Sequence, residues 1–170
     1  GANLLFSLLK IRDDVFGCSR LPKQSWRLKE VSSEKLLTLD ITNNNDVKNI
    51  FLKYKPLTIF NLSAYGSYSR QNEIDKIHYT NYIGTLNLLR NALEIGCDAF
   101  VHAGSSSEYG LNCEAPKEDS ELIPNSDYAV SKVGANYLIK YYGKIYNFPC
   151  VNLRLYSVYG KWEERDRLIP

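Results

Sequence analysis

The chain has 170 residues, of which 44% are hydrophobic and 24% charged, a composition typical of a soluble globular domain. It carries 21 basic against 19 acidic residues, so its net charge is only +2, and no run of five like charges occurs. This balance and the lack of a long apolar stretch argue against a nucleic-acid partner and against a membrane span, and we expect a cytoplasmic location.

The four cysteines are far apart in the sequence and form no C-x-x-C pair; they are Cys18, Cys97, Cys113 and Cys150. A zinc site needs closely spaced donors, and no pair of histidines lies near any of these residues. We therefore expect no metal, and thiols that stay reduced.

Short apolar segments alternate with longer amphipathic ones along the chain. The apolar segments predict strands at residues 15–18, 36–39, 57–62, 99–103 and 150–155. The amphipathic segments predict helices at residues 2–11, 45–54, 82–95 and 126–146, with Gly96 ending the third helix and Ser126 capping the fourth. Along the third helix, residues 86, 89 and 93 are expected to form the buried face. Strand–helix alternation at this spacing predicts an α/β fold with a doubly wound parallel sheet, most of whose strands are covered on both faces.

The strand–helix pattern lacks an expected element at each end. The sequence contains no methionine, begins directly on the first helical pattern, and ends at residues 167–170 shortly after the last strand. A helix that covers a sheet normally belongs to a strand–helix–strand unit. We therefore expect the chain to be a piece of a longer polypeptide.

The main candidates for chemistry are Tyr128 and Lys132. Their i, i+4 spacing places the phenol and the ammonium on one face of the fourth helix, where the cation favours the phenolate. Such a pair suits a general acid/base for interconverting a carbonyl and an alcohol. By itself the spacing is weak evidence, because a solvated Tyr–Lys pair is the commoner reason for it in a chain with 13 tyrosines.

A serine triplet strengthens this interpretation. Ser105 follows the strand at residues 99–103 and precedes Tyr128 by 23 residues. Ligands of parallel α/β sheets bind at the carboxyl ends of the strands, so the Ser105 hydroxyl could bind the reacting oxygen there. Without Tyr128 and Lys132, the triplet would be interpreted as a loop or helix-cap cluster.

These residues belong to a series of motifs that extends over the whole chain. In chain order the motifs are Asp40-Ile41-Thr42, Asn61-Leu62-Ser63-Ala64, Asn81-x-x-Gly84-Thr85-x-Asn87, Ser105-Ser106-Ser107-Glu108-Tyr109-Gly110, Pro124-Asn125-Ser126-x-Tyr128-Ala129-x-Ser131-Lys132 and Leu153-Arg154-Leu155-Tyr156-Ser157-Val158-Tyr159-Gly160. In order and spacing they resemble the extended short-chain dehydrogenase/reductase family, and within it the nucleotide-sugar epimerase/dehydratase branch. The resemblance implies a Rossmann-like fold, a nucleotide-diphosphate sugar as substrate and a homodimer through the third and fourth helices.

The resemblance also implies a role for each matching residue. Tyr128 would be the acid/base, Lys132 would bind the nicotinamide ribose and support the phenolate, and Ser105 would hold the sugar hydroxyl or ketone. The other implied positions are adenine contacts at Asp40 and Ile41, the pyrophosphate side at Ala64, an ordering role for Asn81, and substrate contacts at Ser106, Ser107 and Ser157, the last of which replaces the family's usual asparagine.

Gly1 resembles the last glycine of the family's G-x-x-G-x-x-G turn, which opens the first helix; a cloning remnant is the alternative. The resemblance then implies that residues 1–170 are a partial NAD(P)-binding domain with the first strand and the C-terminal substrate domain absent. Because the glycine turn and the helix N-terminus form the anion site, we expect the chain alone to bind a dinucleotide poorly and to be inactive.

The choice of cofactor depends on the end of the first predicted strand. NAD sites usually place an acidic residue about 20 residues after the glycines, where it binds the ribose 2′-hydroxyl. Here Ser19 and Arg20 stand at that place, and Arg20 could pair with a 2′-phosphate. NADP is therefore slightly favoured, with NAD and a solvated Arg20 as the alternative.

The type of reaction depends on the residues after Ser105. Family members that eliminate water between sugar carbons 4 and 6 typically carry an Asp–Glu pair there, whereas this chain has Ser106 and Ser107, with Glu108 one position later. We therefore expect a nucleotide-sugar epimerase or a 4-keto-sugar reductase that transfers hydride at C4. A 4,6-dehydratase and a non-catalytic dinucleotide-binding fragment are the alternatives. A hydrolase that pairs Ser105 with His78 or His102 is disfavoured, because the G-x-S-x-G elbow is absent.

Overall fold

The structure is a computed structural model that describes residues 1–163. The chain divides into two compact units, one of Gly1–Asp40 with the described part of Ser157–Pro170, and one of Ile41–Tyr156. The predicted end of the pattern at residues 167–170 lies outside the described residues. Within residues 1–163, no helix has the length and apolar character needed to cross a membrane.

The first unit contains a helix and a two-stranded sheet. Helix α1 (Ala2–Leu9) precedes β1 (Gly17–Ser19), which pairs in parallel with β2 (Leu36–Thr38). Leu5 of α1 packs directly on β1, since a Cβ atom on Gly17 would lie 2.6 Å from Leu5 Cδ2. Three short 3₁₀ helices connect the two strands, a detail that periodicity did not predict; they are Pro22–Gln24, Trp26–Leu28 and Ser33–Lys35.

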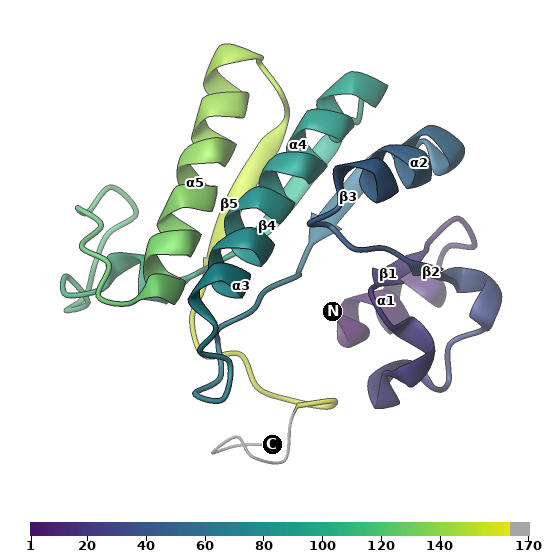
Figure 1. The fold of residues 1–170 in the computed structure, drawn as a ribbon, viewed down its shortest axis with the longest axis horizontal. Helices are drawn as coiled ribbons and strands as arrows, with labels where there is room; N and C mark the ends of the chain where they lie inside the picture. The colour runs from purple at the N-terminus through teal and green to yellow at the C-terminus, as the bar shows by residue number, and fades with distance from the viewer. Residues whose placement is uncertain (164–170) are drawn as a thin grey trace. The chain divides into compact units, whose positions relative to one another are not determined.

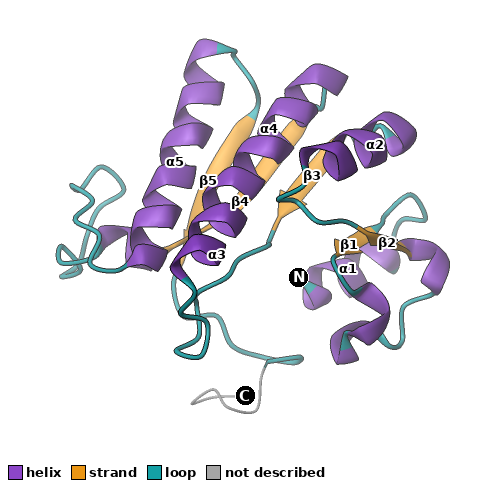
Figure 2. Ribbon diagram, viewed as in Figure 1, coloured by secondary structure: helices purple, strands orange, loops and turns teal. Residues whose placement is uncertain are grey.

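The second unit contains a three-stranded parallel sheet with helices on one face (Figures 1 and 2). Strands β3 (Thr58–Asn61), β4 (Ala99–Ser105) and β5 (Cys150–Leu155) lie in that order. Helices α2 (Asn44–Tyr54), α4 (Gly84–Ile95) and α5 (Asp127–Ile145) cover the face that carries Phe100 and His102 (Figure 1). The opposite face carries the exposed Phe60, Val151 and Leu153. The predicted α/β fold with parallel strands is confirmed, and β4 extends two residues beyond its predicted end.

Two helix ends confirm the local signals in the sequence. Ser126 caps α5, since its side-chain oxygen accepts a hydrogen bond from Ala129 N at 3.2 Å. Gly96 ends α4 in the left-handed region, with φ of 74°, where glycine carries no Cβ penalty.

The region before α4 differs from the prediction. A short helix α3 (Ile74–His78) continues into a π-helix at Tyr79–Ile83, and only then does α4 begin. Tyrosine, threonine, asparagine and isoleucine are weak helix formers, so residues 79–83 carry little helical signal in the sequence. The π-helix brings Asn81 into the interior, and π-bulges are frequent at functional sites.

The buried face of α4 also differs from the predicted apolar stripe. Of residues 86, 89 and 93, only Leu89 is fully buried, while the polar Asn87 and Asn91 are buried as well. Their amides are satisfied, because Asn87 donates to the carbonyl of Ile41 at 3.0 Å and Asn91 donates to Asn44 Oδ1 at 3.0 Å. Hydrophobic spacing does not predict a face of this kind.

Candidate active site

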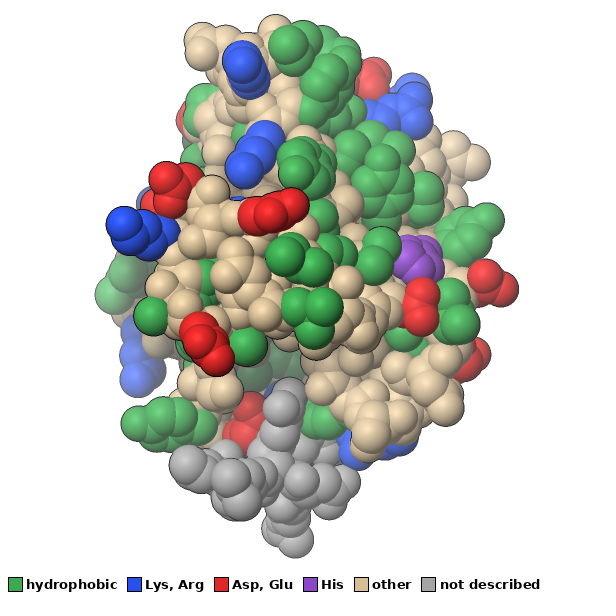
Figure 3. Space-filling view, turned by 90° about the vertical axis from the view of Figure 1, so that its left-hand side faces the viewer, with side chains coloured by type: hydrophobic (Ala, Val, Ile, Leu, Met, Phe, Trp, Pro, Cys, Tyr) green, Lys and Arg blue, Asp and Glu red, His purple; other side chains and the backbone are tan. Residues whose placement is uncertain are grey.

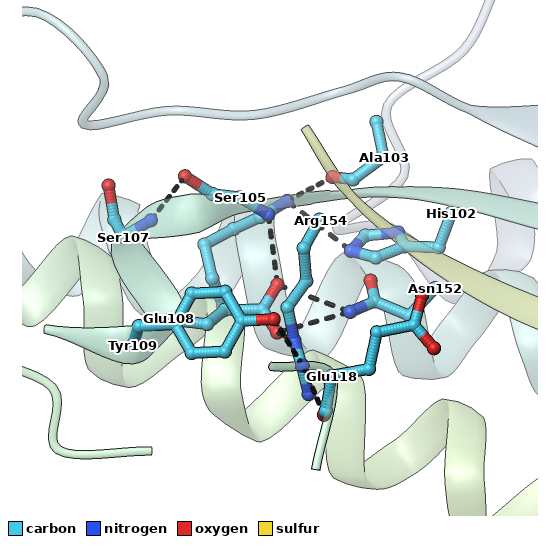
Figure 4. Close-up of polar contacts among 10 residues, drawn as sticks. His102, Ala103, Ser105, Ser107, Glu108, Tyr109, Glu118, Asn152 and Arg154 are labelled. Carbon is cyan, nitrogen blue, oxygen red and sulfur yellow. Dashed lines mark hydrogen bonds and ion pairs between the residues drawn. The ribbon is translucent and has the colours of Figure 1, made fainter. Parts of the chain in front are cut away.

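Ser105 lies at the carboxyl end of β4 and caps the 3₁₀ helix Ser106–Tyr109 (Figure 4). Its Oγ accepts a hydrogen bond from Ser107 N at 3.1 Å, and its backbone N donates to Glu108 Oε1 at 2.9 Å. This reciprocal arrangement is a capping box, so Ser105 does serve as a helix cap. The cap uses only a lone pair of the hydroxyl oxygen, so the O–H proton stays available for a ligand.

Glu108 is fully buried and anchors this turn to the neighbouring strand (Figure 4). Asn152 Nδ2 donates to Oε1 at 3.2 Å and to Oε2 at 3.1 Å, and Arg154 Nε donates to Oε2 at 3.0 Å. Together with the bond from Ser105 N, these contacts engage both carboxylate oxygens. Glu108 therefore has a structural role that the sequence did not indicate.

Arg154 extends the same cluster to the loop that follows the 3₁₀ helix. Its Nη1 donates to Tyr109 Oη at 3.0 Å and to the carbonyl of Glu118 at 2.7 Å. The guanidinium also lies 4.8 Å from the centre of the Tyr109 ring, within cation–π distance. One arginine thus holds both the turn and the loop.

A hollow of about 280 Å³ opens beside this turn. Within residues 1–163 its lining is mainly polar and includes no carboxylate; the residues are Ser106, Ser107, Tyr109, Gly110, Cys113, Pro116, Asn125, Ser126 and Tyr156. The predicted substrate-contacting residues Ser106 and Ser107 are therefore neighbours in one pocket. The sequence did not single out Cys113 or Tyr156.

Tyr128 and Lys132 lie one turn apart near the start of α5. Tyr128 is half-buried, whereas Lys132 is only 1% exposed and donates from Nζ to the carbonyl of Ala103 at 2.6 Å. Burial lowers the pKa of Lys132 from 10.5 to about 8, although the Glu108 carboxylate opposes this shift. Lys132 can therefore gain and lose a proton close to neutral pH.

His102 lies behind Lys132 and is fully buried. Its Nε2 is 3.3 Å from Lys132 Nζ, and its Nδ1 is 3.0 Å from Asn61 Nδ2. Burial, together with the charge of Lys132, lowers the pKa of His102 from 6.5 to about 3, so the ring is neutral at physiological pH. Sequence reasoning considered His102 only as a hydrolase partner of Ser105. Since residues three apart in a strand point to opposite faces, the structure does not support that pairing.

Asn81 joins the loop after β3 to α5. Its amide exchanges two hydrogen bonds with the backbone of Tyr65, at 2.9 and 2.8 Å, and its Nδ2 also donates to Ser131 Oγ at 2.9 Å. The loop then passes close to Tyr128, since a Cβ atom on Gly66 (φ +98°) would lie 3.2 Å from Tyr128 Cδ2. These contacts give a physical basis for the ordering role that the sequence predicts for Asn81.

Two further predicted cofactor residues, Ala64 and Ile41, belong to this unit. Ala64 is exposed in the loop after β3. Ile41 packs tightly on α4, because a Cβ atom on Gly84 would lie 2.5 Å from Ile41 Cδ1.

The other predicted residues belong to the first unit and are Gly1, Ser19, Arg20, Asp40 and Ser157. Gly1 is the N-cap residue of α1, and no side chain caps that helix end. Arg20 is exposed and, with Ser19 and Leu21, lines a broad, open hollow of about 600 Å³ at the end of β1. The uncapped helix start fits a phosphate group, and an exposed arginine beside a hollow fits a ribose or its phosphate.

Comparison with known proteins identifies the family of the chain. The model of the NAD dependent epimerase/dehydratase family matches residues 1–170. The chain is 32% identical over 140 residues to a UDP-glucuronate 4-epimerase of Thermodesulfobacterium geofontis, covering 79% of this chain and 43% of that protein. It is 30% identical over 146 residues to a dTDP-glucose 4,6-dehydratase of Haemophilus influenzae, covering 78% of this chain and 43% of that protein.

A solved structure shows the same fold. The UDP-glucuronic acid 4-epimerase from Bacillus cereus, in complex with NAD, superposes with a TM-score of 0.82 at 27% identity, covering 98% of this chain and 56% of that one. The chain thus spans about half the length of the proteins it matches. Because the family model matches every residue of the sequence, the chain belongs to the NAD dependent epimerase/dehydratase family.

Proposed function

We propose that the protein containing this chain is a nucleotide-sugar 4-epimerase or 4-keto-sugar reductase that transfers hydride at sugar C4. The observation that carries this choice is that the two positions directly after Ser105 are serines and not acidic residues. Ser106 and Ser107 line the pocket, and the first carboxylate that follows them in the chain, Glu108, is buried with both oxygens engaged. Elimination of water needs an acid to protonate the leaving hydroxyl, and Glu108 cannot reach a sugar in that arrangement.

In this proposal, each catalytic residue acts at the oxygen on C4. Tyr128 takes the hydroxyl proton as the ketone forms and returns it when the ketone is reduced. Ser105 donates its free O–H to the same oxygen, and Lys132 supplies the positive charge that stabilises a Tyr128 phenolate. A bound nicotinamide cofactor would accept hydride from C4 and return it.

We propose NAD as that cofactor, in place of the slight preference for NADP that Arg20 suggested. The support is the NAD in the Bacillus cereus epimerase structure and the description of the family. In the protein with its natural flanking sequence, Arg20→Ala should leave the Kd for NADH within about threefold, or about 0.6 kcal/mol, since NADH has no 2′-phosphate with which the exposed guanidinium could pair. A selective, tenfold or larger loss of NADPH binding would instead restore the case for NADP.

We also propose that α5 forms part of a homodimer interface. Tyr137, Tyr141 and Ile145 follow one another at four-residue spacing along this helix, and Tyr137 and Ile145 are 61% and 60% exposed. Figure 3 shows apolar side chains gathered on the side of the molecule that includes α5. Tyr137→Asp with Ile145→Asp should shift the sedimentation coefficient to that of a monomer, and Leu52→Asp on α2 should not. A monomeric unsubstituted protein would contradict this proposal.

The catalytic assignment is tested in the protein with its natural flanking sequence. Tyr128→Phe should lower kcat about 10²- to 10⁴-fold with UDP- or dTDP-linked sugars, while the exposed Tyr137→Phe should have no such effect. A 4-epimerase would show catalytic use of NAD and an epimer as product, and a reductase would consume NADH in proportion to product. Equal activity of Tyr128→Phe, or a 4-keto-6-deoxy sugar as product, would contradict the proposal.

A further inference from the structure

The buried hydrogen bonds behind Lys132 fix the proton position on His102. The ring contacts two nitrogen groups, Asn61 Nδ2 at Nδ1 (3.0 Å) and Lys132 Nζ at Nε2 (3.3 Å). A neutral imidazole carries one N–H, so only one of these sides can accept a hydrogen bond. Which side accepts depends on how the Asn61 amide is held.

Two neighbours hold the Asn61 amide in one orientation. Thr85 Oγ1 donates its proton to the carbonyl of Asn81 at 2.7 Å, so it can only accept from Asn61 Nδ2, at 3.1 Å. On the other side, Ser63 donates from N and Oγ to Asn61 Oδ1, at 3.3 and 2.5 Å. Turning the amide over would oppose donor to donor at Ser63 N. The amide nitrogen therefore points at His102, and His102 Nδ1 is the acceptor.

It follows that the ring proton of His102 is on Nε2 and points at Lys132 Nζ. An ammonium has three donors and no lone pair, so it cannot accept this hydrogen bond, whereas a neutral amine can. Lys132 Nζ can at the same time donate to the Ala103 carbonyl. The hydrogen bond from His102 Nε2–H to Lys132 Nζ can therefore form only when Lys132 is a neutral amine.

We propose that His102, held as its Nε2–H tautomer by Asn61, is a positioning residue that lowers the proton affinity of Lys132. It can donate a hydrogen bond to the neutral amine but not to the ammonium that stabilises the Tyr128 phenolate, so it eases loss of the Lys132 proton without removing the ammonium form. The relevance to catalysis rests on the proposed function of Lys132. Among residues 1–163, the charged group that acts on Lys132 is Glu108 on the 3₁₀ helix, and this carboxylate is paired with Arg154 on β5. Glu108 favours the ammonium and His102 favours the amine, so the two residues act on Lys132 in opposite directions.

The tautomer can be observed directly. In the His78→Gln variant of the 170-residue chain, His102 is the only histidine, and ¹⁵N-histidine labelling reports both of its ring nitrogens. The expected spectrum shows a protonated Nε2 and an unprotonated Nδ1, unchanged down to about pH 4, one unit above the pKa of about 3. A protonated Nδ1, or an imidazolium at neutral pH, would overturn the proposal whether or not the protein is an enzyme.

The substitution Asn61→Asp should reverse the tautomer, because a carboxylate accepts where the amide donates. His102 would then carry its proton on Nδ1, and its Nε2 lone pair would accept from the Lys132 ammonium. The matched control is Asn91→Asp, another change of a buried asparagine to aspartate, since the Asn91 amide donates to Asn44 and to the carbonyl of Asn87 and not to His102. An unchanged tautomer in folded Asn61→Asp would count against the proposal.

A second measurement keeps the test independent of how Asn61→Asp folds. With ¹³C-ε-lysine labelling, His102→Met should raise the titration midpoint of Lys132 by about one pH unit, the equivalent of one lost hydrogen bond to the amine. If His102 instead accepted from the ammonium, the midpoint would fall. A lowered or unchanged midpoint therefore rejects the proposal.

Discussion

The guanidinium of Arg154 donates from Nε to the Glu108 carboxylate at 3.0 Å, and the two side chains are 12% and 0% exposed. Glu108 in turn accepts from the backbone of Ser105, so the ion pair joins β5 to the turn that presents Ser105. Burial of an ion pair gives little net stability by itself, but removing one partner leaves the other charge without compensation. The ion pair therefore helps to hold Ser105 in its position in the site.

The first prediction concerns this pair. Arg154→Met should lower the free energy of unfolding by about 3 to 5 kcal/mol, because it leaves the Glu108 carboxylate buried and without its cation. The measurement is urea denaturation followed by circular dichroism. Arg12→Met is the matched control, since Arg12 pairs with Asp14 at the exposed surface and its loss should leave the stability nearly unchanged. Equal losses in the two variants would contradict the anchoring role of Arg154.

A second prediction concerns Gly104, which faces the same cluster from β4. A Cβ atom there would lie 2.4 Å from Asn152 Oδ1 and 2.5 Å from Glu108 Oε1. Gly104→Ala should therefore cost about 1 to 3 kcal/mol or more, since buried and hydrogen-bonded atoms must shift. Gly143→Ala should instead stabilise by about 0.5 to 1 kcal/mol, because its Cβ atom has room within α5. The melting temperatures of the two variants should move in opposite directions.

A third prediction concerns Asn81. Asn81→Ala removes the side-chain partners of the buried Tyr65 N and O and should cost about 2 kcal/mol or more. Hydrogen exchange should show the Tyr65 amide losing its protection, with the amides of β4 unaffected. The control is Asn112→Ala, since the half-buried Asn112 side chain donates only to the carbonyl of Glu121 in a loop. Retained protection at Tyr65 would show that the loop is held by other contacts.

The strands and longer helices could be predicted because each carries a local signal. The apolar runs at β3, β4 and β5, the glycine after α4 and the serine before α5 each specify their own conformation. The π-helix has no such local signal, because its inward-facing Asn81 makes its contacts with Tyr65 and Ser131. Those contacts join residues 16 and 50 positions apart in sequence.

In the candidate site, too, residues with a local signal could be predicted and residues that depend on distant partners could not. Ser105, Tyr128 and Lys132 could be proposed from the sequence, because strand ends and helix faces are local properties and the surrounding motifs resemble those of the family. The roles of His102 and Glu108 could not be predicted, because each depends on partners from other elements of the fold. His102 contacts Asn61 and Lys132. Glu108 accepts hydrogen bonds from Asn152 and Arg154. The sequence does show that His102 is a polar residue within an apolar strand, but this pattern does not indicate which residues it contacts.

The fourth prediction concerns acid stability and follows from the burial of His102. Its pKa is lowered from 6.5 to about 3 in the folded chain, so the unfolded chain binds more protons between those values. Stability therefore falls as the pH drops below 6.5, and this one residue should cost about 2 kcal/mol between about pH 7 and about pH 5. Carboxylates are still largely ionised in that window, which isolates the contribution of His102. Urea denaturation at the two pH values should show this loss of stability in the unsubstituted chain. The loss should persist in the control His78→Gln, since the His78 side chain is partly exposed, and should be absent in His102→Gln. If His102→Gln retained the full loss, the buried neutral histidine would not be its cause.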